Sequence, residues 1–160
     1  MEAEFAEIGT ERVIKGFLTY RVTDPIMLAK GNLFGHSADT PISLPCWLSQ
    51  EEVDYYVTKF DKNSGFSGGI NFYRNFNRNW ELMAPWVGAK INVPAKFIVG
   101  DLDRVYHMPG IKEYIHSGEF KKKVPLFQEI VVMEGVGHSI NMEKADEINK
   151  HIDDFFRQFN

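Results

Sequence analysis

Hydrophobic residues near the N-terminus recur with the spacing of an amphipathic helix. The run consists of Phe5, Ile8, Val13, Ile14, Phe17 and Leu18. Gly9 and Thr10 interrupt it, so the pattern predicts two short helices rather than one. Further along, Ser49 and Glu52 have the spacing of a capping box, in which each side chain accepts from the other residue's backbone N–H. A third helix is therefore predicted to begin there and to run to about Phe60.

Proline and glycine residues recur in the segment 22–47, and this composition predicts a long loop. A loop of this length is unusual in a compact domain and suggests a lid or a binding loop. Residues 62–69 form a cluster of turn-forming residues. The aromatic-rich segment 70–83 is predicted to be a helix that ends before Pro85. Residues 1–84 are therefore expected to consist of helices joined by loops.

The pattern changes after residue 85. Two short apolar runs, 95–99 and 129–133, are flanked by proline and glycine, as buried strands are. A helix is predicted between them over residues 111–120. One face of a C-terminal helix would carry Ile148, Ile152, Phe155, Phe156 and Phe159. Apolar strands that alternate with helices predict an α/β fold, with a parallel sheet covered on both faces.

Acidic side chains and a histidine follow the two predicted strands. Asp101 and Asp103 come after the first strand, and His138 follows the second. Because parallel strands end at the same edge of a sheet, where ligands bind, these groups are expected to lie together. A carboxylate there could fix the imidazole tautomer of a histidine that activates water, as in the α/β-hydrolases. Either aspartate fits this pattern, and a turn aspartate beside a solvated histidine without catalytic function fits it as well.

Two further candidates lie upstream. Ser67 is the serine of a G-x-S-x-G motif, but polar residues precede it where a nucleophile elbow requires an apolar strand. We therefore interpret this motif as a chance match. Tyr73 lies in the aromatic helix, where its hydroxyl could donate a hydrogen bond into a pocket or be satisfied within the core. The pattern alone does not separate these two alternatives.

Composition narrows the classes of function. The 160 residues carry 18 basic and 22 acidic side chains, and the net charge of −4 argues against a nucleic-acid partner. The hydrophobic fraction of 44 % is sufficient for a core. The single cysteine, Cys46, and the acidic N-terminus predict a cytoplasmic protein without disulfides, signal peptide or membrane span. No metal-binding or dinucleotide-binding motif is present in the sequence, so no metal or cofactor is expected.

Several motifs resemble those of the plant-type soluble epoxide hydrolases, in the α/β-hydrolase superfamily. These motifs are GFSGGINFYRN (residues 65–75) with WEL (80–82), KFIVGDLDRVY (96–106), KEYI (112–115) and EGVGH (134–138). The resemblance covers nearly the whole chain. It implies a helical lid over residues 1–84, followed by the C-terminal half of the core over 85–160, with the last two strands and helices of a parallel sheet. By these motifs Tyr73 resembles a lid tyrosine, Asp103 the supporting carboxylate and His138 the base.

The resemblance also implies a reaction and a substrate class. In this family an aspartate opens the epoxide to form an ester, lid tyrosines donate hydrogen bonds to the epoxide oxygen, and the histidine activates water to release a diol. The implied substrates are water and apolar epoxides of fatty acids or aryl compounds, and the protein could form a homodimer. The nucleophile, its oxyanion loop and a second lid tyrosine have no counterpart in this sequence. We therefore expect the chain alone to be inactive and marginally folded, because a two-stranded sheet of this kind would leave an apolar edge unpaired and its faces uncovered.

Two alternatives stay open at this point. The chain could belong to another α/β-hydrolase, of the esterase or haloalkane dehalogenase type, which uses the same Asp–His support without a lid phenol. It could also be a non-enzymatic protein that binds an apolar ligand or pairs with a full-length relative. A change of Tyr73 and a measurement of ligand binding would separate these alternatives from the epoxide hydrolase.

Overall fold

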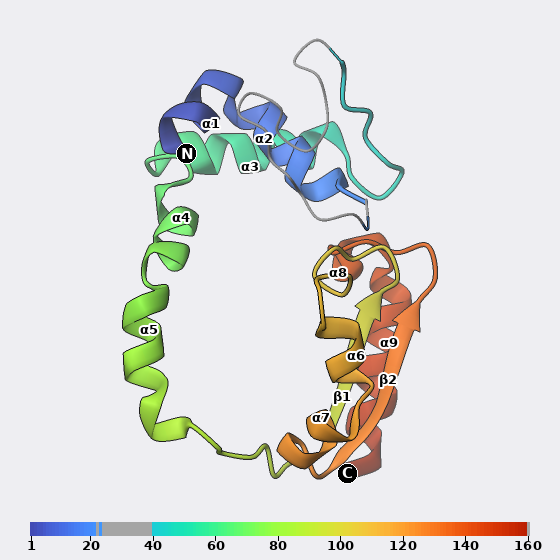
Figure 1. Ribbon diagram of the computed structural model, residues 1–160. Coiled ribbons are helices and arrows are strands. Elements are labelled where there is room, and N and C mark those ends of the chain that lie inside the picture. Colours follow the sequence, from blue (N-terminus) through green and yellow to red (C-terminus); the bar gives the residue numbers. More distant parts are fainter. Residues whose placement is uncertain (22, 24–39, 160) are drawn as a thin grey trace. The chain divides into compact units, whose positions relative to one another are not determined.

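The computed structural model describes residues 1–21, 23 and 40–159, which fall into two compact units (Figure 1). The first unit contains residues 1–19 and 40–87, and the second contains residues 20, 21, 23 and 88–159. The assignment of 1–84 as a lid and 85–160 as half of a core stays a prediction. Most of the loop predicted over 22–47 lies outside the described residues. Within the described part of the chain, no helix combines the length and the apolarity needed to cross a bilayer.

The first unit is helical. Its elements are α1 (Glu2–Ile8), α2 (Thr10–Thr19), α3 (Gln50–Lys62), α4 (Ser67–Arg74), α5 (Phe76–Met83) and the short 3-10 helix η2 (Ala84–Trp86). Gly9, at a φ of 91°, separates the first two helices, which confirms the predicted break. The capping box is also confirmed, because Ser49 N donates to Glu52 Oε2 at 2.8 Å and Glu52 N donates to Ser49 Oγ at 3.2 Å. The helix that follows extends two residues beyond the predicted end.

The prediction of one helix over 70–83 is wrong, because α4 and α5 are separate helices. The preceding turn is also shorter than predicted and occupies residues 63–66. The break lies at Asn75, whose side-chain Nδ2 and backbone N both donate to the carbonyl of Asn71, at 2.8 and 3.2 Å. The backbone bond is an ordinary helical one, and the side-chain bond shares its acceptor, as asparagine side chains do in turns and at helix ends. Sequence periodicity missed the break because apolar residues continue across it.

Aromatic side chains form the centre of the first unit. The Phe66 ring lies 5.1 Å from the Phe5 ring and 4.7 Å from the Phe60 ring, between ring centroids. Val13 of α2 and Val53 of α3 are fully buried. These contacts hold α1, α2 and α3 together through edge-on and tilted ring packing and through aliphatic burial.

The second unit contains the predicted parallel sheet. Strands β1 (Ala95–Gly100) and β2 (Phe127–Met133) run in parallel, with Phe97 opposite Ile130. The helices are α6 (Ile111–Ile115), α7 (Gly118–Lys123), α8 (Ile140–Glu143), α9 (Ala145–Phe156) and the 3-10 helix η3 (Arg157–Phe159). The prediction of one helix over 111–120 is wrong. The chain becomes extended at Ser117, whose hydroxyl donates to the Tyr114 carbonyl at 2.7 Å, and a new helix begins there.

Alternate residues of the strands pack in opposite directions. On one face Phe97, Val99 and Ile130 contact Tyr106 and helix α6. On the other face Ile98, Val131 and Met133 contact Val136, α8 and α9. Figure 1 shows α6 and α9 on either side of the two strands, so both faces of the sheet are covered. The strand and helix pattern predicted this cover, whereas the expectation that a two-stranded sheet leaves its faces uncovered is wrong. Part of the apolar face predicted for the C-terminal helix is nevertheless exposed, at Ile152 and Phe156 of α9 and at Phe159 of η3.

Candidate active site

Parallel pairing brings the segments after β1 and β2 to one edge of the sheet. Asp101 N donates to the Met133 carbonyl at 2.9 Å, and Leu102 N donates to the Val136 carbonyl at 2.9 Å. The two segments therefore continue to hydrogen-bond beyond the ends of the strands. This bonding fixes the positions of the side chains that follow, as was expected for the carboxyl ends of parallel strands.

Gly100 allows this close approach. A Cβ atom at this position would lie under 3.0 Å from the carbonyl oxygens of Val136 and Gly137. Backbone atoms cannot move aside as a flexible side chain can. The two segments can therefore approach this closely only because Gly100 has no side chain.

Gly100→Ala is expected to separate the two segments and to destabilise the second unit by about 1–3 kcal/mol, the usual cost of overpacking. Urea unfolding, with an NMR signal of His138 as a local probe, measures both effects. Gly118→Ala is a matched control, because its Cβ would meet nothing within 4 Å at the start of α7. Equal stability of the Gly100→Ala variant and the parent would contradict the role given to Gly100.

The close approach of the segments after β1 and β2 brings Asp103 and His138 together. His138 Nδ1 lies 2.9 Å from Asp103 Oδ2, and the other carboxylate oxygen accepts from Val105 N at 2.8 Å. Asp103 is buried, whereas the His138 side chain is 62 % exposed. Because an ionised carboxylate only accepts, Nδ1 is the donor, and neutral His138 keeps its lone pair on Nε2. The pair therefore has the geometry of a base with an exposed nitrogen and a buried orienting carboxylate.

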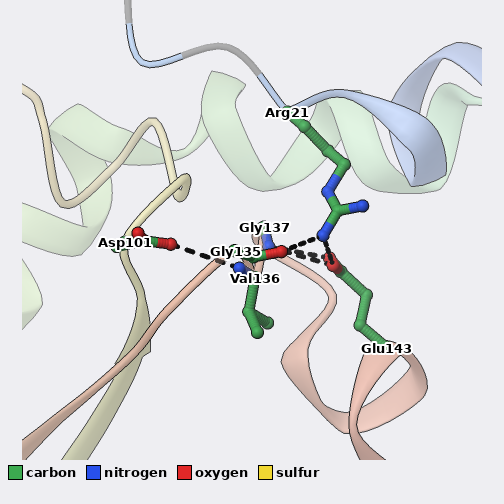
Figure 2. Close-up of polar contacts among 6 residues, drawn as sticks. All are labelled: Arg21, Asp101, Gly135, Val136, Gly137 and Glu143. Atoms are coloured by element: carbon green, nitrogen blue, oxygen red, sulfur yellow. Dashed lines mark hydrogen bonds and ion pairs between the residues drawn. The ribbon is translucent and has the colours of Figure 1, made fainter.

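Asp101 has a different position. Its Oδ1 accepts from Val136 N at 3.2 Å (Figure 2), so its carboxylate bonds the backbone that leads to the histidine. The Asp101 carbonyl is 2.6 Å from His107 Nε2. In the structure, Asp103 therefore lies at the imidazole and Asp101 at the turn.

Two residues that the sequence analysis did not select also bond this turn. The Glu143 carboxylate accepts from Gly137 N, and Arg21 bonds both Glu143 and the Gly135 carbonyl (Figure 2). Neither residue stands in a recognisable motif. The only sequence signal is that Glu143 follows His138 by five positions in a short helix, which by itself is typical of a surface carboxylate.

Tyr73 belongs to the first unit, at the last turn of α4. Its side chain is exposed, at 65 %, so Tyr73 is not buried in the core, which was one of the two alternatives that the sequence allowed. Its ring packs edge-on against Phe72 and Phe76 at 5.5 and 5.4 Å. Tyr73 also lines an apolar cavity of about 340 Å³, together with residues that include Phe5 and Phe17.

The structure gives no catalytic or metal-binding surroundings to the other residues considered in the sequence analysis, among the residues that it describes. Ser67 begins α4 and follows the turn at 63–66, so it lacks the strand that a nucleophile elbow requires. Cys46 is an exposed free thiol. Among the residues that the structure describes, no three His, Cys, Asp or Glu side chains form a group that could hold a metal ion.

The known proteins that are similar to this chain in sequence and in structure are epoxide hydrolases. No model of a protein family matches the chain. The chain is 54 % identical to Epoxide hydrolase 1 of Siraitia grosvenorii over 158 residues, which are 99 % of this chain and 49 % of that protein. It is 37 % identical to Epoxide hydrolase A of Mycobacterium tuberculosis over 117 residues, which are 72 % of this chain and 34 % of that protein. The solved structure of potato (Solanum tuberosum) epoxide hydrolase I matches with a TM-score of 0.88 and 53 % identity, over 99 % of this chain and 49 % of that chain.

Sequence and fold agree in these comparisons. The chain spans about half the length of the plant relatives that it matches. Its helices and small parallel sheet correspond to a C-terminal part of the α/β-hydrolase fold, which confirms the fold class expected from the motifs. The chain therefore belongs to the plant-type epoxide hydrolases of the α/β-hydrolase superfamily and corresponds to their C-terminal half.

Proposed function

We propose that this chain supplies the water-activating pair and a lid tyrosine of an enzyme that hydrates epoxides to vicinal diols. The observation that carries the proposal is the 2.9 Å hydrogen bond between His138 and the buried Asp103 at the carboxyl ends of the strands. The aspartate nucleophile would come from the other half of the protein, which the relatives contain and this sequence does not match. The 160 residues alone are accordingly proposed to be inactive.

The pair would act in the second half of the reaction. Nε2 of His138 would take a proton from water while the water oxygen attacks the carbonyl carbon of the aspartyl ester. The bond between that carbon and the diol oxygen then breaks, and the diol oxygen receives this proton. The carboxyl group that forms releases the second proton of the water as the carboxylate is regenerated, which balances the proton that the epoxide oxygen takes up in the first half. Asp103 would stabilise the imidazolium that forms and hold Nε2 toward the water.

Tyr73 would act in the first half. When the carboxylate attacks an epoxide carbon, the C–O bond breaks and negative charge develops on the oxygen. The O–H of a phenol can donate a hydrogen bond to that oxygen. The exposure of Tyr73 and its place beside an apolar cavity support this role.

The substrate class and location complete the proposal. The phenylalanines around the cavity that Tyr73 lines favour an apolar epoxide, of a fatty acid or an aryl compound. The exposed free thiol of Cys46 is compatible with a reducing, cytoplasmic location. Homodimer formation stays a prediction.

A hybrid enzyme tests the role of Tyr73. It joins the N-terminal half of the potato enzyme, up to the point where the similarity begins, to the 160 residues of this chain. Tyr73→Phe in this hybrid is expected to lower kcat/KM for an aryl epoxide by about 10²–10³-fold, the usual effect of removing one donor to a developing oxyanion. Diol formation measured by chromatography gives the rate.

Tyr55→Phe is the matched control, because Tyr55 lies on α3 of the same unit and is exposed to a similar degree, at 60 %. It is expected to leave the rate unchanged. Full epoxide turnover by Tyr73→Phe would contradict the proposed role. Turnover of an ester or a haloalkane in place of the epoxide would favour the other α/β-hydrolase types.

A further inference from the structure

A buried carboxylate bonds the turn that carries His138. The Glu143 side chain is 2 % exposed, and each of its carboxylate oxygens lies 3.0 Å from Gly137 N. Gly137 directly precedes His138, so this shared hydrogen bond fixes the Val136–Gly137 peptide group, one residue before the histidine. Met142 N and Glu143 N in turn donate to the Ser139 carbonyl at 2.9 Å, so the carboxylate stands on the helical turn that follows the histidine.

Arg21 completes the arrangement from a distant part of the sequence. Its Nη2 lies 2.8 Å from Glu143 Oε2 and also donates to the Gly135 carbonyl (Figure 2). A carboxylate removed from water is costly unless it is paired and hydrogen-bonded. Here Arg21 compensates the charge of Glu143, while the two side chains together hold Gly135 and Gly137 on either side of Val136.

The turn has room for these contacts because Gly137 has no side chain. A Cβ atom on Gly137 would lie 2.8 Å from Glu143 Oε1 and 3.3 Å from Arg21 Cγ. Gly135 adopts a φ of 69°, in the left-handed region that favours glycine. The backbone thus approaches the charged pair closely, and a displacement of the pair would be transmitted to the neighbouring His138.

We infer that Glu143 and Arg21 are positioning residues for His138. They hold the 135–137 turn so that Nδ1 of His138 meets Asp103 and Nε2 faces the position of the hydrolytic water. Neither residue touches His138 through its side chain in the hydrogen bonds described, so they act through the backbone. The inference rests on the proposed function for its kinetic consequence, but its structural consequence, a fixed His138–Asp103 bond, can be measured without turnover.

The kinetic test compares the two half-reactions in the hybrid enzyme. Glu143→Ala is expected to slow hydrolysis of the ester by about 10–100-fold, because a small displacement of a catalytic group has effects of this size. Formation of the ester, which does not use His138, is expected to stay within about twofold. Glu143→Gln keeps an oxygen that can accept from Gly137 N, so it is expected to recover part of the lost rate. Rapid-quench mass spectrometry of the ester measures both steps.

Asp153→Ala is the matched control. Asp153 forms an ion pair with Arg157 at 2.6 Å in the same unit, and both side chains are largely exposed. Its loss is expected to change neither step. If Glu143→Ala fails to fold, the same two measurements on Arg21→Ala test the positioning role. The Arg21 side chain is 36 % exposed, and its removal still allows the hydrogen bond from Gly137 N to Glu143.

The Nδ1 proton of His138 gives the second readout. In the parent hybrid this proton, bonded to Asp103, is expected to give a protected downfield NMR signal, which Glu143→Ala or Arg21→Ala should broaden or remove. If the parent forms no diol but this change in the signal occurs, the proposed function fails and the positioning role stands. An unchanged signal, or equal slowing of both half-reactions in the folded variants, would overturn the positioning role.

Discussion

His138→Gln in the hybrid enzyme is expected to form the ester at the normal rate and to hydrolyse it about 10²–10⁴-fold more slowly, the range over which a general base contributes. Glutamine can still accept a hydrogen bond, but it cannot take a proton from water. In the proposed mechanism, the attack on the epoxide uses the carboxylate of the other half and the lid phenol, so it does not require the imidazole. The variant should therefore accumulate as a covalent ester.

Mass spectrometry of the intact protein measures this result as an added mass equal to that of the epoxide. Pre-steady-state assays should show one equivalent of epoxide consumed, followed by very slow diol release. His151→Gln is the control, since His151 lies on α9, where its Nδ1 is 3.4 Å from Lys96 Nζ. Unchanged steady-state turnover of His138→Gln would remove this residue from the mechanism.

The proximity of Asp103 and His138 could be predicted from the sequence, because it depends only on the parallel pairing of the two strands that precede them. Two apolar runs with a helix between them predict parallel strands, and parallel strands end at the same edge of a sheet. The residues directly after each run must then lie near each other, whatever the loops do. The topology explains this proximity, whereas the hydrogen bond itself depends on how the chain turns after each strand.

The choice between Asp101 and Asp103 could not be made from the pattern. The two residues are two positions apart and would point the same way in an extended segment. Their positions depend on how the segment turns after β1, where Asp103 N donates to the Gly100 carbonyl at 3.2 Å. Such local bonding leaves no periodic signal. The motif resemblance, which selected Asp103, carried information that hydrophobic periodicity does not.

The contribution of Arg21 was beyond sequence reasoning for a different reason. Arg21 and the Gly135 carbonyl that it bonds are 114 positions apart. Neither Arg21 nor Glu143 interrupts a pattern or forms a motif, and each is of a residue type that is mostly found at the surface. Only the folded chain shows that the Glu143 carboxylate is buried against Gly137. The breaks in the predicted helices at Asn75 and Ser117 were missed for a related reason, since side-chain hydrogen bonds to the backbone terminate them.

The 160-residue chain alone is expected to form no diol above the uncatalysed rate, whereas the hybrid enzyme should turn over an aryl epoxide. In the proposed mechanism the base of the second half-reaction has no ester to hydrolyse without the carboxylate nucleophile, so the loss is complete rather than partial. The sheet of the chain alone has two strands in the part that the structure describes. Apolar side chains of α9 and η3 are exposed there as well, at Ile152, Phe156 and Phe159. We therefore also expect a broad, weakly cooperative thermal transition.

Three samples separate the chemical reason from the folding reason. They are the chain alone, the N-terminal half of the potato enzyme alone, and the hybrid, each assayed for diol and followed by circular dichroism on heating. If the hybrid is active and each half is inactive, catalysis depends on groups from both halves. A mixture of the two separate halves that gains activity and a sharper melt would show that this chain folds onto its complement, because association stabilises only the native form. Diol formation by the isolated chain, abolished by His138→Gln, would overturn the expectation and would require a nucleophile within these 160 residues.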